Sequence, residues 1–180
     1  MKYTGVVRRV DELGRIVIPK EIRKTAKIKD GDPLEFTVDN ESIIIKRYYP
    51  LEKWVSYAQY VANSIKEILE KECLVVDQNK VVASSQSISD SVEKIITENL
   101  ISLINKKQTV VLSKQEGAEF LTLIPEKDFN ESTRIIVPII YKENSCGAII
   151  VLGFDETEEL STKDVNSIRI CANLLSEHFN

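Results

Sequence analysis

The sequence changes its pattern at Pro50, and this change divides the chain. Before Pro50, short runs of β-branched residues alternate with turn residues, which is typical of short strands. After Pro50, apolar residues recur at steps of three and four, which is typical of an amphipathic helix. We therefore expect a first domain at residues 1–50, a linking amphipathic helix at 51–72 and a second domain at 73–180.

The first fifty residues predict four short strands and one short helix in the order ββαββ. Pro19 is a favoured first residue of a helix, and the turn cluster at 29–33 must end that helix. The strands are expected at 5–10, 16–18, 34–38 and 42–47, and the helix at 20–27. Elements this short bury little core on their own. We expect a second copy of the chain to cover the apolar face, which gives an obligate two-fold dimer.

The helix predicted after Pro50 leaves two interpretations open. Its apolar positions form a heptad seam, and a second flank of the same helix is apolar too. The seam consists of Leu51, Trp54, Ala58, Val61, Ile65 and Ile68, and the flank of Val55, Ala62 and Leu69. The helix either packs on its own domain or forms an intermolecular seam, and two apolar flanks allow both.

Residues 73–180 predict one domain with a mostly antiparallel sheet bracketed by helices, so we place the whole chain in the α+β class. Asp90 and Glu93 resemble a capping box that opens a middle helix, and Ser161 with Asp164 opens the last helix. The strands are expected at 73–77, 81–83, 109–112, 120–124, 134–141 and 147–154.

The net charge of −4 hides an uneven distribution along the 180 residues. Residues 1–29 hold nine basic and three acidic residues, a net of +6, whereas residues 51–180 hold 13 basic and 20 acidic residues, a net of −7. Positive charge concentrated on a short segment is the electrostatic footprint of a protein that binds a polyanion. From charge alone, the alternative is a solvated basic face without a partner.

The sequence lacks the patterns of membrane, metal and catalytic proteins. No apolar run approaches the roughly 18 residues of a membrane-spanning helix and no signal region is present, so we expect a cytoplasmic protein. Cys73, Cys146 and Cys171 have no CxxC spacing, and with the single His178 they form no zinc pattern. We expect the cysteines to be packing residues. No constellation supports hydrolysis, so we expect no enzyme, no metal and no cofactor.

The first domain contains two long motifs, RRVDELGR and VIPKEIR. They lie in the stretch TGVVRRVDELGRIVIPKEIRKTAKIKDGDPLEFTVD, residues 4–39, which closely resembles the DNA-binding domain of the AbrB family of transition-state regulators. The resemblance implies a swapped-hairpin dimer that binds double-stranded DNA. With its second domain, the chain resembles the sporulation regulators of this family that carry a C-terminal GAF-like domain. That resemblance implies a transcription regulator of forespore genes, an activator at some promoters and a repressor at others.

The resemblance also assigns DNA contacts to basic residues on the strand ends, the loop and the short helix. The matching positions are Arg8, Arg9, Arg15, Arg23 and Lys24. Such side chains bind phosphates, and the arginines also make bidentate contacts to guanine. Lys24 stands where some relatives have arginine and supplies a point charge only. In a regular strand Arg8 and Arg9 point to opposite faces, so either the strand breaks there or one of them does not contact DNA.

The GAF-like domain resembles its family less specifically, and its role stays open. Such domains bind small ligands or serve as dimer interfaces, so the resemblance implies an unknown small-molecule ligand, an interface or both. The helices at 51–71 and 161–179 are expected to pack with their copies in a second chain as a four-helix bundle. Together with the swapped dimer, the bundle gives a homotetramer if the two interfaces join different pairs of chains, and a dimer if they join the same pair.

Two other functions remain as alternatives. Other swapped-hairpin proteins are antitoxins that neutralise toxins through disordered acidic tails, but here a patterned, core-forming domain stands in place of such a tail. The second alternative is a ligand-sensing interaction protein whose basic end binds no DNA.

Overall fold

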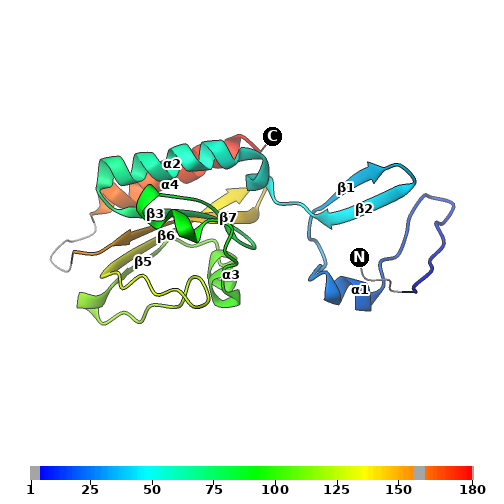
Figure 1. The fold of residues 1–180 in the computed structure, drawn as a ribbon, viewed down its shortest axis with the longest axis horizontal. Helices are drawn as coiled ribbons and strands as arrows, with labels where there is room; N and C mark the ends of the chain where they lie inside the picture. Colours follow the sequence, from blue (N-terminus) through cyan, green and yellow to red (C-terminus); the bar gives the residue numbers. More distant parts are fainter. Residues whose placement is uncertain (1–4, 156–160, 180) are drawn as a thin grey trace. The chain divides into compact units, whose positions relative to one another are not determined.

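The computed structural model describes residues 5–155 and 161–179 and consists of two compact units, residues 1–48 and 49–180 (Figure 1). The first holds one short helix and a two-stranded hairpin, and the second holds a five-stranded sheet with helices on both faces. These elements confirm the predicted α+β class.

The first unit forms the predicted short helix and the predicted second hairpin. Helix α1 spans Lys20–Thr25 and follows Pro19, and the strands β1 (Leu34–Asp39) and β2 (Ser42–Arg47) pair antiparallel. The helix ends before Lys27, whose backbone is left-handed with φ 54°. Residues 5–18, expected to contain the first two strands, hold only a turn at 12–14 in the single chain.

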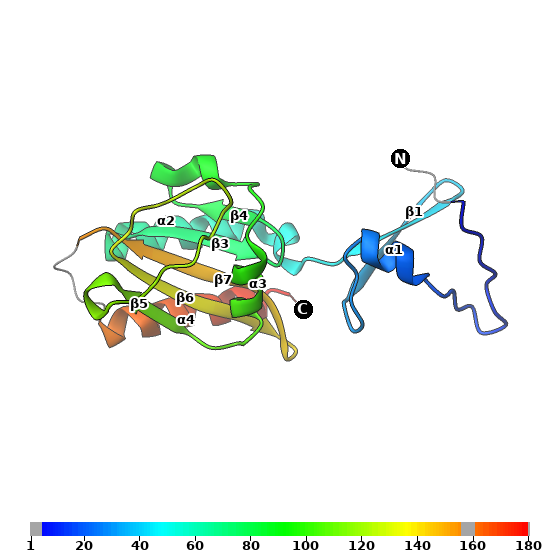
Figure 2. The same cartoon turned by 90° about the horizontal axis from the view of Figure 1, so that it is seen from below.

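The second unit is built on an antiparallel sheet with the strand order β4-β3-β7-β6-β5 (Figure 2). The strands are β3 (Glu72–Asp77), β4 (Val81–Ser84), β5 (Val110–Ser113), β6 (Thr133–Tyr141) and β7 (Asn144–Gly153). Long β-branched runs make β6 and β7 the centre of the sheet, because such side chains pack well on a pleated surface. Five of the six strands predicted for this domain are therefore confirmed.

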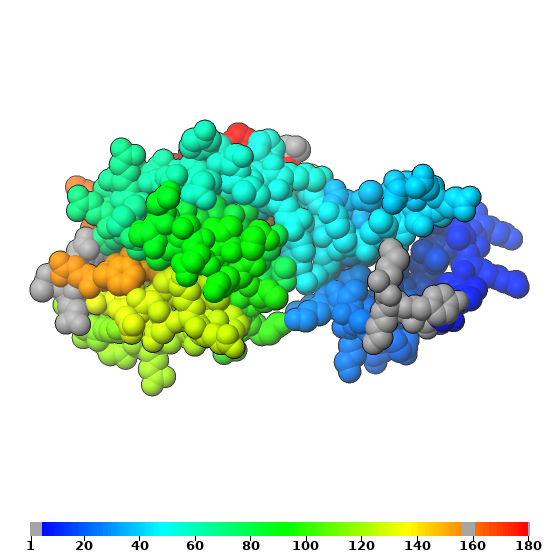
Figure 3. Space-filling model, in the orientation of Figure 1, coloured from blue at the N-terminus to red at the C-terminus, as the bar shows by residue number. Residues whose placement is uncertain are grey.

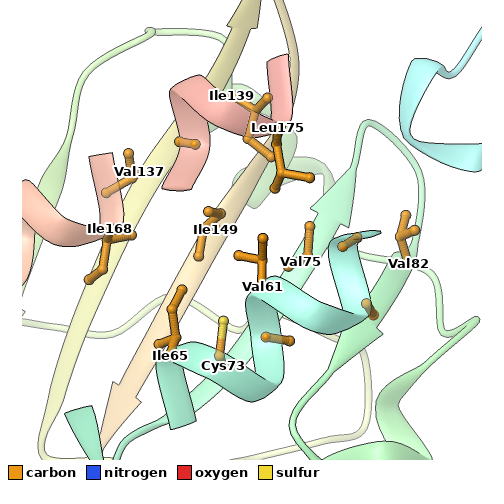
Figure 4. Packing of buried hydrophobic residues seen from close by; sticks show 14 of the residues in the cluster. Val61, Ile65, Cys73, Val75, Val82, Val137, Ile139, Ile149, Ile168 and Leu175 are labelled. Carbon is orange, nitrogen blue, oxygen red and sulfur yellow. The ribbon is translucent and has the colours of Figure 1, made fainter. Parts of the chain in front are cut away.

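Two long helices cover one face of this sheet. The 3₁₀ helix η1 (Pro50–Trp54) leads into α2 (Val55–Leu69), which lies beside α4 (Thr162–Glu177) in both ribbon views (Figures 1 and 2). Alternate residues of the strands, such as Val75 and Ile149, point at Val61 of α2 and Leu175 of α4 (Figure 4). Helix α2 therefore packs on its own domain, one of the two interpretations that the heptad seam left open.

The predicted start of the last helix is confirmed in detail. The side chain of Ser161 accepts a hydrogen bond from the amide of Asp164, and the Asp164 carboxylate accepts one from the amide of Ser161. At the other end of α4, the ring of His178 lies 5.0 Å from that of Trp54 and 4.4 Å from that of Tyr57, measured between centroids. The single histidine thus packs the end of α4 against the start of α2.

The other face of the sheet is covered by α3 (Glu98–Ile104) and by irregular segments. The remaining short elements are the 3₁₀ helices η2 (Gln86–Ser91) and η3 (Lys114–Glu116). The strand residues that alternate with the first set, such as Leu74 and Ile150, are buried here against Leu100 and Ile104 of α3. The period of two along the strands therefore supplies both layers of the core.

The capping box predicted at Asp90 and Glu93 is wrong, because the helix begins later. Residues 93–96 run beside the 79–81 segment, where Val81 donates to the carbonyl of Lys94 at 2.9 Å and Ile96 donates to that of Asn79 at 2.9 Å. These backbone groups therefore form hydrogen bonds with the 79–81 segment at the edge of the sheet and are not available for a helix. Helix α3 starts after Thr97, whose hydroxyl accepts a hydrogen bond from the amide of Leu100.

The strand predicted at 120–124 is also wrong. Two of its backbone carbonyls accept hydrogen bonds from side chains and not from a neighbouring strand. The Arg134 guanidinium donates to the carbonyl of Leu121 at 2.6 Å, and the Thr97 hydroxyl donates to that of Thr122 at 2.6 Å. The apolar pattern that suggested a strand has a different cause. Leu123 and Ile124 are buried in the core layer under α3.

The cysteines are thiols set among apolar side chains. Cys73 and Cys146 are buried and Cys171 is half-buried. Burial raises the pKa of all three thiols, that of Cys146 to about 11, so the reactive thiolate is scarce at neutral pH. Among the described residues, no group of His, Cys, Asp and Glu side chains is arranged to hold a metal ion. None of the described helices is long and apolar enough to span a membrane.

The β3–β4 turn contains a buried carboxylate, Asp77. One oxygen, Oδ1, accepts hydrogen bonds from the amides of Asn79 at 2.6 Å and Lys80 at 2.7 Å. Within the described part of the chain, the buried Oδ2 finds no donor. Burial raises the pKa of Asp77 to about 6, against the opposing effect of the two amides.

We expect Asp77→Asn to stabilise the protein above pH 6. Because the folded state holds the proton of Asp77 more tightly than the unfolded chain, the neutral acid favours folding below pH 4, and this contribution is lost as pH rises through about 6. Asparagine keeps the acceptor for both amides without the charge. Urea unfolding should show a gain of about 2 kcal/mol at pH 8 that disappears near pH 4.

The control for this prediction is Glu126→Gln, which neutralises an exposed carboxylate of the same unit. It should change the unfolding free energy by less than about 0.5 kcal/mol at either pH. A gain for Asp77→Asn that is the same at pH 4 and pH 8 would contradict the account.

Candidate nucleic-acid interface

The first unit leaves most of its apolar side chains exposed. No described residue between 5 and 48 is buried. Seven large apolar side chains are 62% to 82% exposed, namely Val7, Val10, Leu13, Val17, Phe36, Val38 and Ile43. A unit with no buried residue gains little hydrophobic stabilisation, because that stabilisation scales with the apolar area removed from water.

The loop that carries three of the predicted DNA-binding arginines is ordered by one carboxylate. Asp11 Oδ1 accepts hydrogen bonds from the amides of Leu13 at 3.0 Å and Arg15 at 2.8 Å. The Asp11 amide in turn donates to the carbonyl of Arg15, and Gly14 donates to the carbonyl of Asp11. Gly14 has φ +75°, which the tight turn requires and other residues rarely adopt.

Arg8, Arg9 and Arg15 lie on the two sides of this turn and are exposed. Their segment, dark blue in the ribbon, forms an open loop in both views, and its side chains project outward in the space-filling view (Figures 1, 2 and 3). Arg8 Nη1 donates to the carbonyl of Val7 at 2.9 Å. Arg15 Nε donates to Asp11 Oδ2 at 2.7 Å, and the hydrogen bonds from Arg15 hold the pKa of the Asp11 carboxyl below its ordinary value.

Arg23 and Lys24 lie in the last turn of α1. Arg23 is half-buried, and its Nη1 lies 2.5 Å from Oδ1 of Asp30 in the following turn. Lys24 is exposed. The five predicted residues thus come from two places in the unit, three from the open loop and two from the end of the short helix.

The sequence reasoning missed the carboxylates that hold two of these arginines. Neither Asp11 nor Asp30 was predicted to contact an arginine, yet each contacts a guanidinium group. A signal for Asp11 was present, because an aspartate followed by a glycine at a turn commonly accepts hydrogen bonds from the amides after it. No local signal marks the contact between Asp30 and Arg23, since it depends on how the chain turns after α1.

Comparison with known proteins places both units. Residues 54–180 match the family described as "Stage V sporulation protein T C-terminal, transcription factor". Stage V sporulation protein T of Bacillus subtilis is 36% identical over 159 residues, which cover 87% of this chain and 88% of that protein. The chain belongs to the stage V sporulation protein T family. The family resemblance stated from the sequence is thereby confirmed.

The first unit has relatives of its own. The transition state regulatory protein AbrB of Bacillus subtilis is 60% identical over 50 residues, which cover 28% of this chain and 52% of that protein. Residues 7–52 also match the family described as "Antidote-toxin recognition MazE, bacterial antitoxin". The AbrB-type character of the first unit, predicted from its two motifs, is confirmed by this identity.

The second unit of this stage V sporulation protein T relative has the GAF fold. The GAF domain of Acinetobacter phosphoenolpyruvate-protein phosphotransferase superposes with a TM-score of 0.60 at 14% identity and covers 69% of this chain and 81% of that chain. A free methionine-R-sulfoxide reductase of Thermoplasma acidophilum superposes with a TM-score of 0.53 at 15% identity, over 72% of this chain and 94% of that one. At these identities the similarity shows the fold and not an activity.

Proposed function

We propose that this member of a family of sporulation transcription factors binds double-stranded DNA through the basic residues of its first unit, acting as a homodimer. The proposal rests on the combination of charge and exposed apolar surface in the first unit. This unit combines a net charge of +6 over residues 1–29 with apolar side chains that a single chain leaves exposed. The 60% identity with AbrB supports the same interpretation.

The exposed apolar side chains support the dimer. Phe36, Val38 and Ile43 on the hairpin and Val7 and Val17 beside the loop are each at least 62% exposed. A second copy that contributes the same segments would bury them, and the two extended segments at 5–10 and 16–18 would then gain strand partners. In this swapped-hairpin arrangement, a two-fold axis presents two sets of basic residues to the DNA.

We assign the DNA contacts to Arg8, Arg9, Arg15, Arg23 and Lys24. The exposed guanidinium groups of the loop can reach phosphates and guanine edges, and Lys24 contributes a point charge. Since no recognition helix is involved, we expect a loose sequence preference that depends on DNA shape as well as on bases. The direction of regulation then varies between promoters, with activation at some and repression at others.

The second unit, in this proposal, receives a signal and joins dimers. We assign residues 1–50 to DNA binding, 51–72 to the linking helix and 73–180 to the GAF-like regulatory domain, whose small-molecule ligand is unknown. Apolar side chains stand on the outer faces of both long helices, with Tyr60 and Ile68 on α2 and Ile170 and Leu174 on α4 at least half exposed. These faces suit a four-helix bundle with a second chain, which would make the protein a homotetramer.

The antitoxin alternative has one observation in its favour, the match of residues 7–52 to an antitoxin family. That match ends at residue 52, close to the start of the second unit at residue 49. The chain beyond it is a packed domain with two core layers, in place of a disordered segment that could wrap around a toxin. Binding of sporulation promoter DNA by the purified protein would favour the regulator over both the antitoxin and the interaction protein.

Arg15→Ala should weaken binding to a sporulation promoter fragment about tenfold or more, because each chain loses a charged contact. In a series of salt concentrations, the slope of log K against log salt should fall by about 0.9 for each lost phosphate contact. Fluorescence anisotropy measures both quantities. Lys106→Ala, which removes an exposed charge from the second unit, should change neither. Wild-type affinity and slope in Arg15→Ala would contradict the assignment.

Ile170→Glu should reduce the assembly from four chains to two, because it places a charge in the proposed bundle. Light scattering coupled to size-exclusion chromatography should give four times the 20.5 kDa chain mass for the wild type and twice that mass for the variant. Ile95→Glu is the matched control, since Ile95 is similarly exposed (62% against 59%) but belongs to neither long helix and pairs with Lys80 in an isolated bridge. A wild-type mass of two chains, unchanged by Ile170→Glu, would contradict the bundle between dimers.

A further inference from the structure

The two carboxylate oxygens of Asp11 accept different hydrogen bonds in the loop. Oδ1 accepts hydrogen bonds from the backbone amides of Leu13 and Arg15, and these bonds shape the turn. Oδ2 lies 2.7 Å from Arg15 Nε and accepts its hydrogen bond. One oxygen therefore orders the backbone, and the other holds the arginine side chain.

We propose that Asp11 is a positioning residue that presents Arg15 to DNA, an inference that rests on the proposed function. A guanidinium group is planar, so a hydrogen bond at Nε fixes the direction in which the terminal nitrogens Nη1 and Nη2 point. These two nitrogens form the fork that binds a phosphate or the O6 and N7 atoms of guanine. The Arg15 side chain, 72% exposed, would otherwise sample many rotamers and lose that freedom on binding.

This role and simple charge repulsion predict opposite results. Asp11 is a negative charge in the segment proposed to contact a polyanion. If it acted only through its charge, removing it would strengthen binding to any DNA, because one repulsive interaction per chain would disappear. If it positions Arg15, removing the charge on Oδ2 weakens binding to the preferred sequence even though the protein becomes more positive.

The Asp11→Asn substitution tests the role of Oδ2 separately from that of Oδ1. The amide carbonyl of asparagine still accepts the hydrogen bonds of the two backbone amides, whereas its NH₂ group cannot accept the hydrogen bond of Arg15 Nε. The neighbouring exposed carboxylate supplies a matched control, since Glu12→Gln changes the net charge by the same amount. Both variants are made in the full chain, alone and combined with Arg15→Ala.

Dissociation constants are measured at one salt concentration for a sporulation promoter fragment and for a random-sequence duplex of the same length. We expect Asp11→Asn to weaken promoter binding about fivefold, because part of the ordering of Arg15 then has to occur on binding. Glu12→Gln should leave promoter binding unchanged or slightly tighter. In the Arg15→Ala background, Asp11→Asn should no longer weaken binding, because the side chain that it positions is gone.

The outcomes separate this inference from the proposed function. If Asp11→Asn binds the promoter as tightly as the wild type or more tightly while Arg15→Ala is weakened, the positioning role is overturned and the DNA contact of Arg15 stands. If Asp11→Asn weakens binding equally with and without Arg15, Asp11 acts on the loop as a whole, and the positioning role is again overturned. If Arg15→Ala binds both duplexes like the wild type, the proposed DNA contact itself fails.

Discussion

The structure depends on an apolar surface that a single chain cannot cover. In the first unit, the hairpin and the loop leave large side chains such as Val38 and Leu13 about three-quarters exposed (74% and 75%). A short polypeptide gains its stability almost entirely from burying such groups. The first unit therefore requires a second copy for its stability, whether or not it binds DNA. The same pairing would place two copies of the basic segment around a symmetry axis.

The distribution of charge gives the two units different roles. Taken as a whole, the chain is acidic, with a net charge of −4, which would argue against a nucleic-acid partner. Only the first fifty residues carry a net positive charge, whereas residues 51–180 carry a net charge of −7. In the proposed function, the acidic second unit would repel the DNA backbone and reduce indiscriminate binding, while the basic loop and the end of α1 would supply the attraction.

Much of the fold was predictable because its signals are local. The long β-branched runs of β6 and β7 and the capping box at Ser161 and Asp164 each lie within a short stretch of the sequence, and both predictions are confirmed. The two errors in the second unit, at 90–93 and 120–124, have one cause. In both places the backbone groups bond to distant segments, to 79–81 in the first case and to Thr97 and Arg134 in the second, and no local pattern encodes such partners. The same holds in the site, where the contact between Arg23 and Asp30 depends on the path of the chain after α1.

The junction between the units is held firmly on the side of the GAF fold. Only Tyr49 separates the end of the first unit at Tyr48 from η1, which begins at Pro50. Leu51 is fully buried in the core layer under α2 and α4, and the ring of Trp54 contacts His178 at the end of α4. Because both long helices fix this segment, a ligand or partner that shifted α2 against α4 would act directly on the point where the chain enters the DNA-binding unit. In the proposed function, signal input to the second unit and DNA binding by the first would therefore be joined through this one short covalent connection.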